Sequence, residues 1–219
     1  PPTTLDADSI RDEKLKVLKA LRPINKSNYQ QSTVRGQYIG GFVNGVEVPG
    51  YLDEPDANER SKTETFVAIK AQIDNWRWAG VPFYLRTGKR MPAKTSEVVI
   101  YFKRQPHNLF GDSFASLPPN KLVIRLQPDE GVEVTVMNKV PGLTTSGSMD
   151  LQKSNLNLSF SEAFQGERIP DAYEKLLLEV MLGNQALFVR RDEIEQAWSW
   201  VDSIISAWNS SNQPPEPYQ

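Results

Sequence analysis

The stretch Asn120–Gly142, NKLVIRLQPDEGVEVTVMNKVPG, contains two strand-like runs separated by a Pro-Asp-Glu-Gly turn. This connection is too short for a helical crossover, so the two strands are expected to pair antiparallel. Side chains alternate between the two faces of a strand. The faces of the first run hold Leu122, Ile124 and Leu126 on one side and Val123, Arg125 and Gln127 on the other. We expect the apolar face to be core and the polar face to be either a binding surface or plain solvent-facing surface.

Similar runs and helical patterns extend outward from this pair. Strand-like runs lie at 63–75, 81–88, 96–103 and 149–160, and helical periodicity lies at 5–23, 170–185 and 191–211. The segments between the strands leave no room for βαβ crossovers. The sequence therefore predicts an α+β fold with a large, mostly antiparallel sheet packed on one face by helices.

The helices carry their own end signals and apolar stripes. Asp6 or Asp8 is expected to cap the first helix, Gly183 or Asn184 to end the second, and Asp192 to cap the last. The last helix has an apolar stripe at the 3.6-residue period, which we interpret as core. The stripe consists of Ile194, Ala197, Trp198, Val201, Ile204, Ile205 and Trp208.

Composition excludes several classes of protein. The net charge is -2 and the pI is about 5.6, without the basic excess that is typical of nucleic-acid-binding proteins. With 0 cysteines, the chain has no disulfide, thiol nucleophile or cysteine metal site. It has no apolar run long enough to cross a bilayer and no signal peptide, so we expect a cytoplasmic protein without membrane contact. The Pro-Pro beginning and the proline-rich end suggest a piece of a longer protein.

The run FYLRTGKRMPAK at 83–94 concentrates positive charge on this mildly acidic chain. It lacks the Gly-x4-Gly-Lys-Ser/Thr spacing of a P-loop, and no GxGxxG fingerprint occurs anywhere in the chain. Gly88 permits a tight turn, from which Lys89 projects, and Lys94 returns beyond Pro92. Two ammonium groups on a short loop suit one small anion such as a phosphate. A solvated cationic turn remains the alternative.

No complete catalytic set is apparent in the residues. His107 is the only histidine, and no aspartate and nucleophile are arranged around it as in a triad. The acidic run DEPD at 53–56 lacks EF-hand spacing, so no metal site is predicted. The sequence by itself indicates an anion-binding domain.

Long blocks of the chain closely resemble the substrate domain of the glucose-6-phosphate dehydrogenase family. The blocks are DADSIRDEKLKVL, VRGQY, VPGYLDE, TETFVAI, NWRWAGVPFYLRTGKRMPAK, NKLVIRLQPDEGV, NKVPG and DAYEKLLLEVMLGNQALFVRRDE. They occur in the family's order and cover about residues 1–208. The resemblance implies that 1–219 is the family's C-terminal domain, truncated just before its final segment, with the NADP-binding Rossmann domain absent from this sequence.

The resemblance also implies roles for particular residues. The family's substrate-binding lysine of the RTGK turn matches Lys89, the basic residue five positions on matches Lys94, and the substrate-edge glutamine matches Gln127. In members with a second, structural NADP, the matching residues are Arg86 and Arg125.

Two departures from the family pattern limit these roles. Further basic residues of the structural NADP site are replaced here by Thr95, Val99 and Thr135, which argues against that site. The catalytic histidine and the coenzyme fingerprint are also missing, so no catalytic residue is assigned and NADP is expected to bind mainly to the missing domain. The parent enzyme is expected to oxidise glucose 6-phosphate to 6-phosphogluconolactone, and this chain to be inactive alone.

The family uses its sheet for dimerisation, which implies a homodimer, or a tetramer, through this sheet. The runs 132–138 and 156–160 are the expected contributors, with Val132, Val134 and Val136 alternating with Glu133, Thr135 and Met137. Two other functions remain open: a stand-alone sugar-phosphate-binding module and a purely structural oligomerisation domain. An upstream coenzyme domain would favour the dehydrogenase over both.

Overall fold

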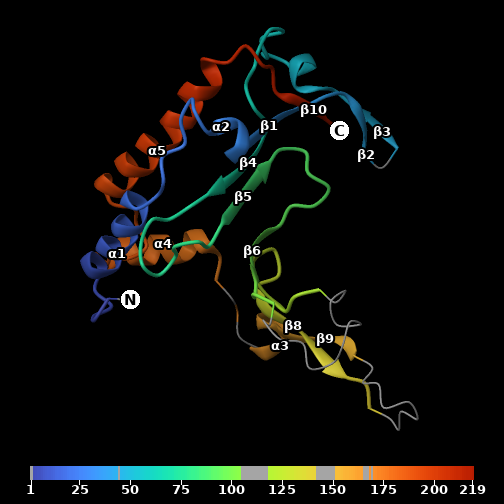
Figure 1. Cartoon of the computed structure of the whole chain (residues 1–219). Coiled ribbons are helices and arrows are strands. Elements are labelled where there is room, and N and C mark those ends of the chain that lie inside the picture. Colours follow the sequence, from blue (N-terminus) through green and yellow to red (C-terminus); the bar gives the residue numbers. More distant parts are fainter. Residues whose placement is uncertain (1, 44, 105–117, 142–150, 165–167, 169) are drawn as a thin grey trace. The chain divides into compact units, whose positions relative to one another are not determined.

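The chain forms two compact units. The computed structural model describes residues 2–43, 45–104, 118–141, 151–164, 168 and 170–219 (Figure 1). The first unit comprises Pro1–Met91 and Asp171–Gln219, and the second comprises Pro92–Pro170. The predicted α+β class is confirmed. The described strands form two four-stranded sheets, both mostly or wholly antiparallel, and a two-stranded hairpin.

The first unit combines a sheet with most of the helices (Figure 1). Its helices are α1 (Ala7–Lys19), α2 (Tyr29–Ser32), η1 (Tyr51–Asp53), α4 (Ala172–Met181) and α5 (Arg191–Asn209). Its strands are β1 (Thr33–Tyr38), β2 (Gly41–Val43), β3 (Val46–Val48), β4 (Phe66–Ala71), β5 (Phe83–Gly88) and β10 (Glu216–Tyr218). The main sheet has the order β10-β1-β4-β5, with only β10 running parallel to its neighbour. The proline-rich end of the chain thus supplies an edge strand.

The core of the first unit lies between this sheet and helix α5. Trp200, Ile204 and Trp208 from α5 cluster with Ile24 and Ala71, and partly buried residues of β4 and β5 pack around them. The two buried indole N–H groups are satisfied, because Trp200 donates to the carbonyl of Arg22 and Trp208 donates to the Thr33 hydroxyl. Helix α5 therefore anchors the sheet through residues spaced four apart.

The predicted core stripe of α5 is only partly correct. Ile204 and Trp208 are buried as expected, whereas Trp198 is 57% exposed and Ile194 is 44% exposed. Trp200, which the stripe omitted, is buried. Helix α5 has apolar residues on two sides, and periodicity alone selected one side without knowing which side the sheet covers.

Of the predicted N-caps, that of α1 is confirmed and that of α5 is wrong. Asp6 caps α1 as predicted, because its carboxylate accepts the Ser9 N–H at 2.9 Å. The predicted cap of α5 is wrong: the N-cap is Arg190, whose N–H donates to Glu193 at 2.7 Å. Asp192 lies inside the first turn instead, where its carboxylate accepts from the Arg190 guanidinium. The helix therefore begins two residues earlier than predicted, and Arg190 forms ion pairs with Asp8, Asp12 and Asp192.

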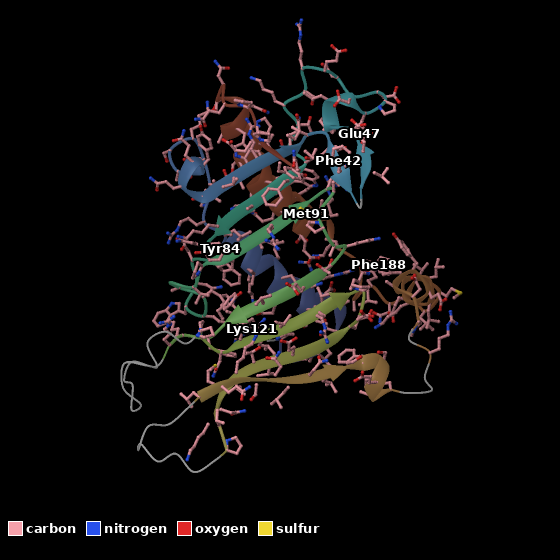
Figure 2. The ribbon with its side chains drawn as sticks, turned by 90° about the vertical axis from the view of Figure 1, so that its right-hand side faces the viewer. Phe42, Glu47, Tyr84, Met91, Lys121 and Phe188 are labelled. Atoms are coloured by element: carbon pink, nitrogen blue, oxygen red, sulfur yellow. The ribbon has the colours of Figure 1, made fainter. Side chains whose placement is uncertain are left out.

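The second unit is a four-stranded antiparallel sheet followed by a short helix. Its elements are β6 (Ser96–Tyr101), β7 (Lys121–Gln127), β8 (Gly131–Lys139), β9 (Leu151–Ser159) and α3 (Phe160–Ala163), and the strand order is β6-β7-β8-β9. In Figure 2, Lys121 marks the start of β7. The prediction about its faces is wrong: Leu126 is 50% exposed, whereas Val123, on the face of Arg125, is 6% exposed. Alternation identifies two faces but cannot say which one is covered.

Candidate functional site

Lys89 lies on a turn whose backbone is held by hydrogen bonds to both the N–H and the carbonyl of Lys89. Strand β5 pairs with β4 up to the partners Gly88 and Phe66, and Lys89 follows immediately. The Lys89 N–H donates to the carbonyl of Thr65 at 2.8 Å, and the Lys89 carbonyl accepts from the Tyr218 hydroxyl at 2.9 Å. The backbone that carries this ammonium group is therefore held in a single orientation.

A small pocket opens beside this turn. It has a volume of about 170 Å³ and is lined by Glu64, Thr65, Val67, Thr87, Gly88 and Lys89. Gly88 has no room for a side chain, since a Cβ there would lie 2.8 Å from Phe66 Cδ2 and 2.9 Å from Met91 Sδ. Figure 2 marks Met91 just beyond the turn. The glycine therefore allows the Phe66 ring and the Met91 side chain to approach the turn closely.

Arg90, the next cation, is already engaged within the protein. It forms an ion pair with Glu54, and its guanidinium lies 4.9 Å from the centroid of the Tyr38 ring. The hydrogen bond to Glu54, followed by that to Tyr38, raises the pKa of Arg90 above its ordinary value. Lys89 forms no ion pair within the described part of the chain. Of these two adjacent cations, Lys89 is the one whose charge is available to a ligand.

Arg86 is exposed on β5 but faces away from the pocket. Successive side chains alternate across a strand, so Arg86 lies on the face opposite Thr87, which lines the pocket. Its cross-strand partner is Ala68. Arg86 therefore does not share the Lys89 pocket.

The other predicted site residues belong to the second unit. Lys94 and Gln127 are exposed, Lys94 before β6 and Gln127 at the end of β7. Arg125 is half-buried and already bonded within its sheet: it donates to the Asn157 side chain at 2.7 Å and lies 3.9 Å from Glu133. Its Nε is buried without a partner among the described atoms. On the expected polar face of β7, Arg125 is thus already engaged by Asn157 and Glu133 of the same sheet.

The sequence did not identify two residues that hold the Lys89 turn. Thr65 and Tyr218 contact the turn through hydrogen bonds, and Tyr218 comes from a short strand with no recognisable pattern. This strand consists of only three residues, Glu-Pro-Tyr, which is too short for an alternating pattern to be recognised in the sequence. His107 lies outside the described residues. Among the residues that are described, no cluster suits a metal ion and no helix has the length and hydropathy to span a membrane.

A second, larger hollow lies between α1 and α5 in the first unit. Its volume is about 510 Å³, and its lining is mainly apolar, with Val17, Leu18, Ile194 and Trp198 among the residues that form it. Only Lys14 brings positive charge to this lining, and Glu193 opposes it. Each pocket is lined by one lysine and one glutamate, but the smaller pocket at the Lys89 turn also has the polar side chains of Thr65 and Thr87, so a small anion is accommodated better there.

Comparisons with known proteins identify the family of this chain. The family model "Glucose-6-phosphate dehydrogenase, C-terminal domain" matches residues 1–219. A glucose-6-phosphate 1-dehydrogenase of Dickeya dadantii is 62% identical over 219 residues, which are 100% of this chain and 44% of that protein. A protein of the same name from Mycolicibacterium smegmatis is 49% identical over 218 residues, which are 100% of this chain and 43% of that protein.

Solved structures show the same similarity. A glucose-6-phosphate dehydrogenase in complex with its substrate glucose-6-phosphate superposes with a TM-score of 0.85 at 37% identity, covering 100% of this chain and 42% of that one. The glucose-6-phosphate 1-dehydrogenase of Mycobacterium avium gives a TM-score of 0.77 at 31% identity, covering 100% and 41%. The chain spans less than half the length of the relatives it matches. It belongs to the family of glucose-6-phosphate dehydrogenase C-terminal domains.

Proposed function

We propose that this chain is the substrate-binding part of an enzyme that oxidises D-glucose 6-phosphate to 6-phospho-D-glucono-1,5-lactone with reduction of NADP. The observation that carries the proposal is the Lys89 turn, where an ammonium group without an ion-pair partner among the described residues stands on a doubly hydrogen-bonded backbone beside a pocket. A cation on an ordered backbone suits a phosphate dianion because only the lysine side chain, and not the turn, loses conformational freedom at binding. The family membership makes glucose 6-phosphate the phosphate ester to test.

The proposal keeps the residue roles that the family resemblance implies. Lys89 binds the substrate phosphate, and Lys94 and Gln127 supply further substrate contacts. Arg86 and Arg125 are assigned to a structural NADP in case one binds, although Arg125 already has partners in its own sheet. The reactive NADP is bound mainly by a coenzyme domain outside this sequence, and the enzyme acts in the cytoplasm.

The enzymatic proposal is tested by comparing two preparations. We expect the full-length protein to reduce NADP when glucose 6-phosphate is added, whereas the 219-residue chain alone reduces none, because it has no coenzyme fingerprint. The measurement is the appearance of NADPH absorbance, with glucose as the control substrate. A stand-alone sugar-phosphate-binding module would give no reduction in either preparation.

We further propose that the enzyme is a homodimer, or a tetramer built from such dimers, through the apolar sheet face of the second unit. Cross-strand registers place apolar side chains from each of the four strands on one face. The apolar sheet face consists of Val98, Ile100, Leu122, Ile124, Val132, Val134, Leu156 and Leu158. Its outer members are exposed, with Leu156 at 64% and Leu158 at 51%. A contiguous exposed apolar patch of this kind marks an interaction surface, and a second copy covers it with identical chemistry.

Leu156→Asp in the full-length protein is expected to weaken the dimer roughly 100-fold or more. Burying a leucine side chain contributes about 1.5–3 kcal/mol, each dimer buries two copies, and the new carboxylates face an apolar surface. The measurement is the dimer dissociation constant from sedimentation or light scattering across a dilution series. Leu156→Met, which conserves volume and polarity, is the matched control and keeps the wild-type constant. A wild-type monomer, or an unchanged Leu156→Asp dimer, contradicts this proposal.

A further inference from the structure

Tyr218, on the last strand of the structure, connects the sheet to the Lys89 turn through a chain of hydrogen bonds. The Tyr38 N–H donates to Thr65 Oγ1 at 3.0 Å, and Thr65 Oγ1 lies 2.9 Å from Tyr218 Oη. The Tyr218 hydroxyl lies 2.9 Å from the carbonyl oxygen of Lys89. The chain thus runs from β1, through the residue before β4, to β10 and ends on the peptide of the proposed phosphate-binding lysine.

The donors in this chain can be assigned by counting hydrogens. Thr65 Oγ1 accepts the Tyr38 N–H, so its own hydrogen is free to be donated to Tyr218 Oη. The single Tyr218 hydrogen is then directed to an acceptor that has none to give, the Lys89 carbonyl, with the Thr65 carbonyl at 3.2 Å as a second acceptor. Each member donates to the next, and the final acceptor is the Lys89 peptide.

The ring of Tyr218 is itself fixed by packing. Its centroid lies 5.7 Å from that of Phe66 and 6.4 Å from that of Tyr38, both in edge-to-face geometry. Gly36 leaves the space for this ring, because a Cβ there would lie 2.9 Å from Tyr218 Cδ1. The backbone of Tyr218 is paired as well, since its carbonyl accepts the Ile39 N–H at 2.9 Å. The hydroxyl therefore reaches the turn from a rigid position.

We propose that Tyr218 is a positioning residue for substrate binding, acting through the Lys89 peptide. Without its hydroxyl, the turn keeps the bond between the Lys89 N–H and Thr65, but the Lys89 carbonyl loses its restraint. The peptide plane after Lys89 is then free to rotate, and the ammonium group is spread over more orientations before the phosphate arrives. This inference rests on the proposed function, in which Lys89 binds the phosphate of the substrate.

The test is steady-state kinetics of the full-length enzyme carrying Tyr218→Phe, which keeps the ring and removes only the hydroxyl. KM for glucose 6-phosphate is expected to rise roughly 3- to 10-fold, with kcat within about twofold of wild type. Thr65→Val removes the preceding link of the chain and is expected to shift KM in the same direction. Tyr84→Phe is the matched control, because Tyr84 is 72% exposed on β5, where Figure 2 labels it, and it keeps wild-type KM.

A double mutant separates positioning of Lys89 from a general structural effect. On a Lys89→Ala background, Tyr218→Phe is expected to have no further effect on KM, because its target is gone. A full additional rise in KM on that background overturns the inference, and so does a silent Tyr218→Phe in an enzyme whose KM responds strongly to Lys89→Ala. If Lys89→Ala itself leaves KM unchanged, the proposed phosphate-binding role of Lys89 fails first, and this outcome is distinct from the other two.

Discussion

Replacing Lys89 by alanine in the full-length enzyme is expected to lower kcat/KM for glucose 6-phosphate roughly 10- to 150-fold. A charge-assisted hydrogen bond to a ligand contributes about 1.5–3 kcal/mol, and this contact is made in the ground state and the transition state alike. The loss therefore appears mainly as a higher KM. The backbone of the turn keeps its bond from the Lys89 N–H to Thr65, so the fold of the site is retained.

The measurement is the rate of NADP reduction over a range of glucose 6-phosphate concentrations. Lys70→Ala is the matched control, since Lys70 is an exposed lysine on β4, opposite Tyr84 of β5, and does not line the pocket. Lys89→Arg separates charge from geometry, because arginine keeps the charge but presents it as a planar fork. An active enzyme that is indifferent to Lys89→Ala would mean that the turn is a solvated loop.

Ile204→Ala is expected to destabilise the first unit by about 2–5 kcal/mol. Ile204 is 1% exposed in the cluster between α5 and the sheet, and truncating it removes buried methyl groups and leaves a cavity. Trp200 and Trp208 lie four residues to either side, so tryptophan fluorescence in a urea titration of the full-length protein reports the loss directly.

The control for this prediction is a second isoleucine-to-alanine substitution, at an exposed position of the same helix. Ile194 is 44% exposed, so Ile194→Ala removes less buried surface while gaining the same helix propensity. We expect it to lower the urea midpoint by less than half as much as Ile204→Ala. Equal shifts for the two variants would place the core elsewhere than between α5 and the sheet.

Local signals in the sequence predicted most of the elements and their ends. Asp6 begins α1 as its carboxylate predicts, and Gly183, at φ +68, follows α4 in the left-handed conformation that favours glycine. The strands from β4 to β9 lie within the runs read from alternation and turn residues. These features depend on hydrogen bonds and torsion angles within a few residues, so the sequence contains the information that fixes them.

The assignment of faces and partners depended on residues far apart in the chain. The sequence could not tell that Val123 is the buried side chain of β7 while Leu126 is exposed, or that α5 presents Trp200 and not Trp198 to the sheet. Alternation and helical periodicity define which side chains share a face, but burial is decided by whichever element packs on that face.

The candidate site shows the same division. The run RTGKR by itself identified a cationic turn on a strand end, and the family resemblance singled out Lys89 within it. The structure added that Arg90 is occupied by Glu54, 36 residues away, and that the Lys89 carbonyl is held by Tyr218, 129 residues away. The sequence determined where the charges lie along the chain. Only tertiary packing decided which charge is left unpaired and how its backbone is held, because those properties come from contacts that have no local signature.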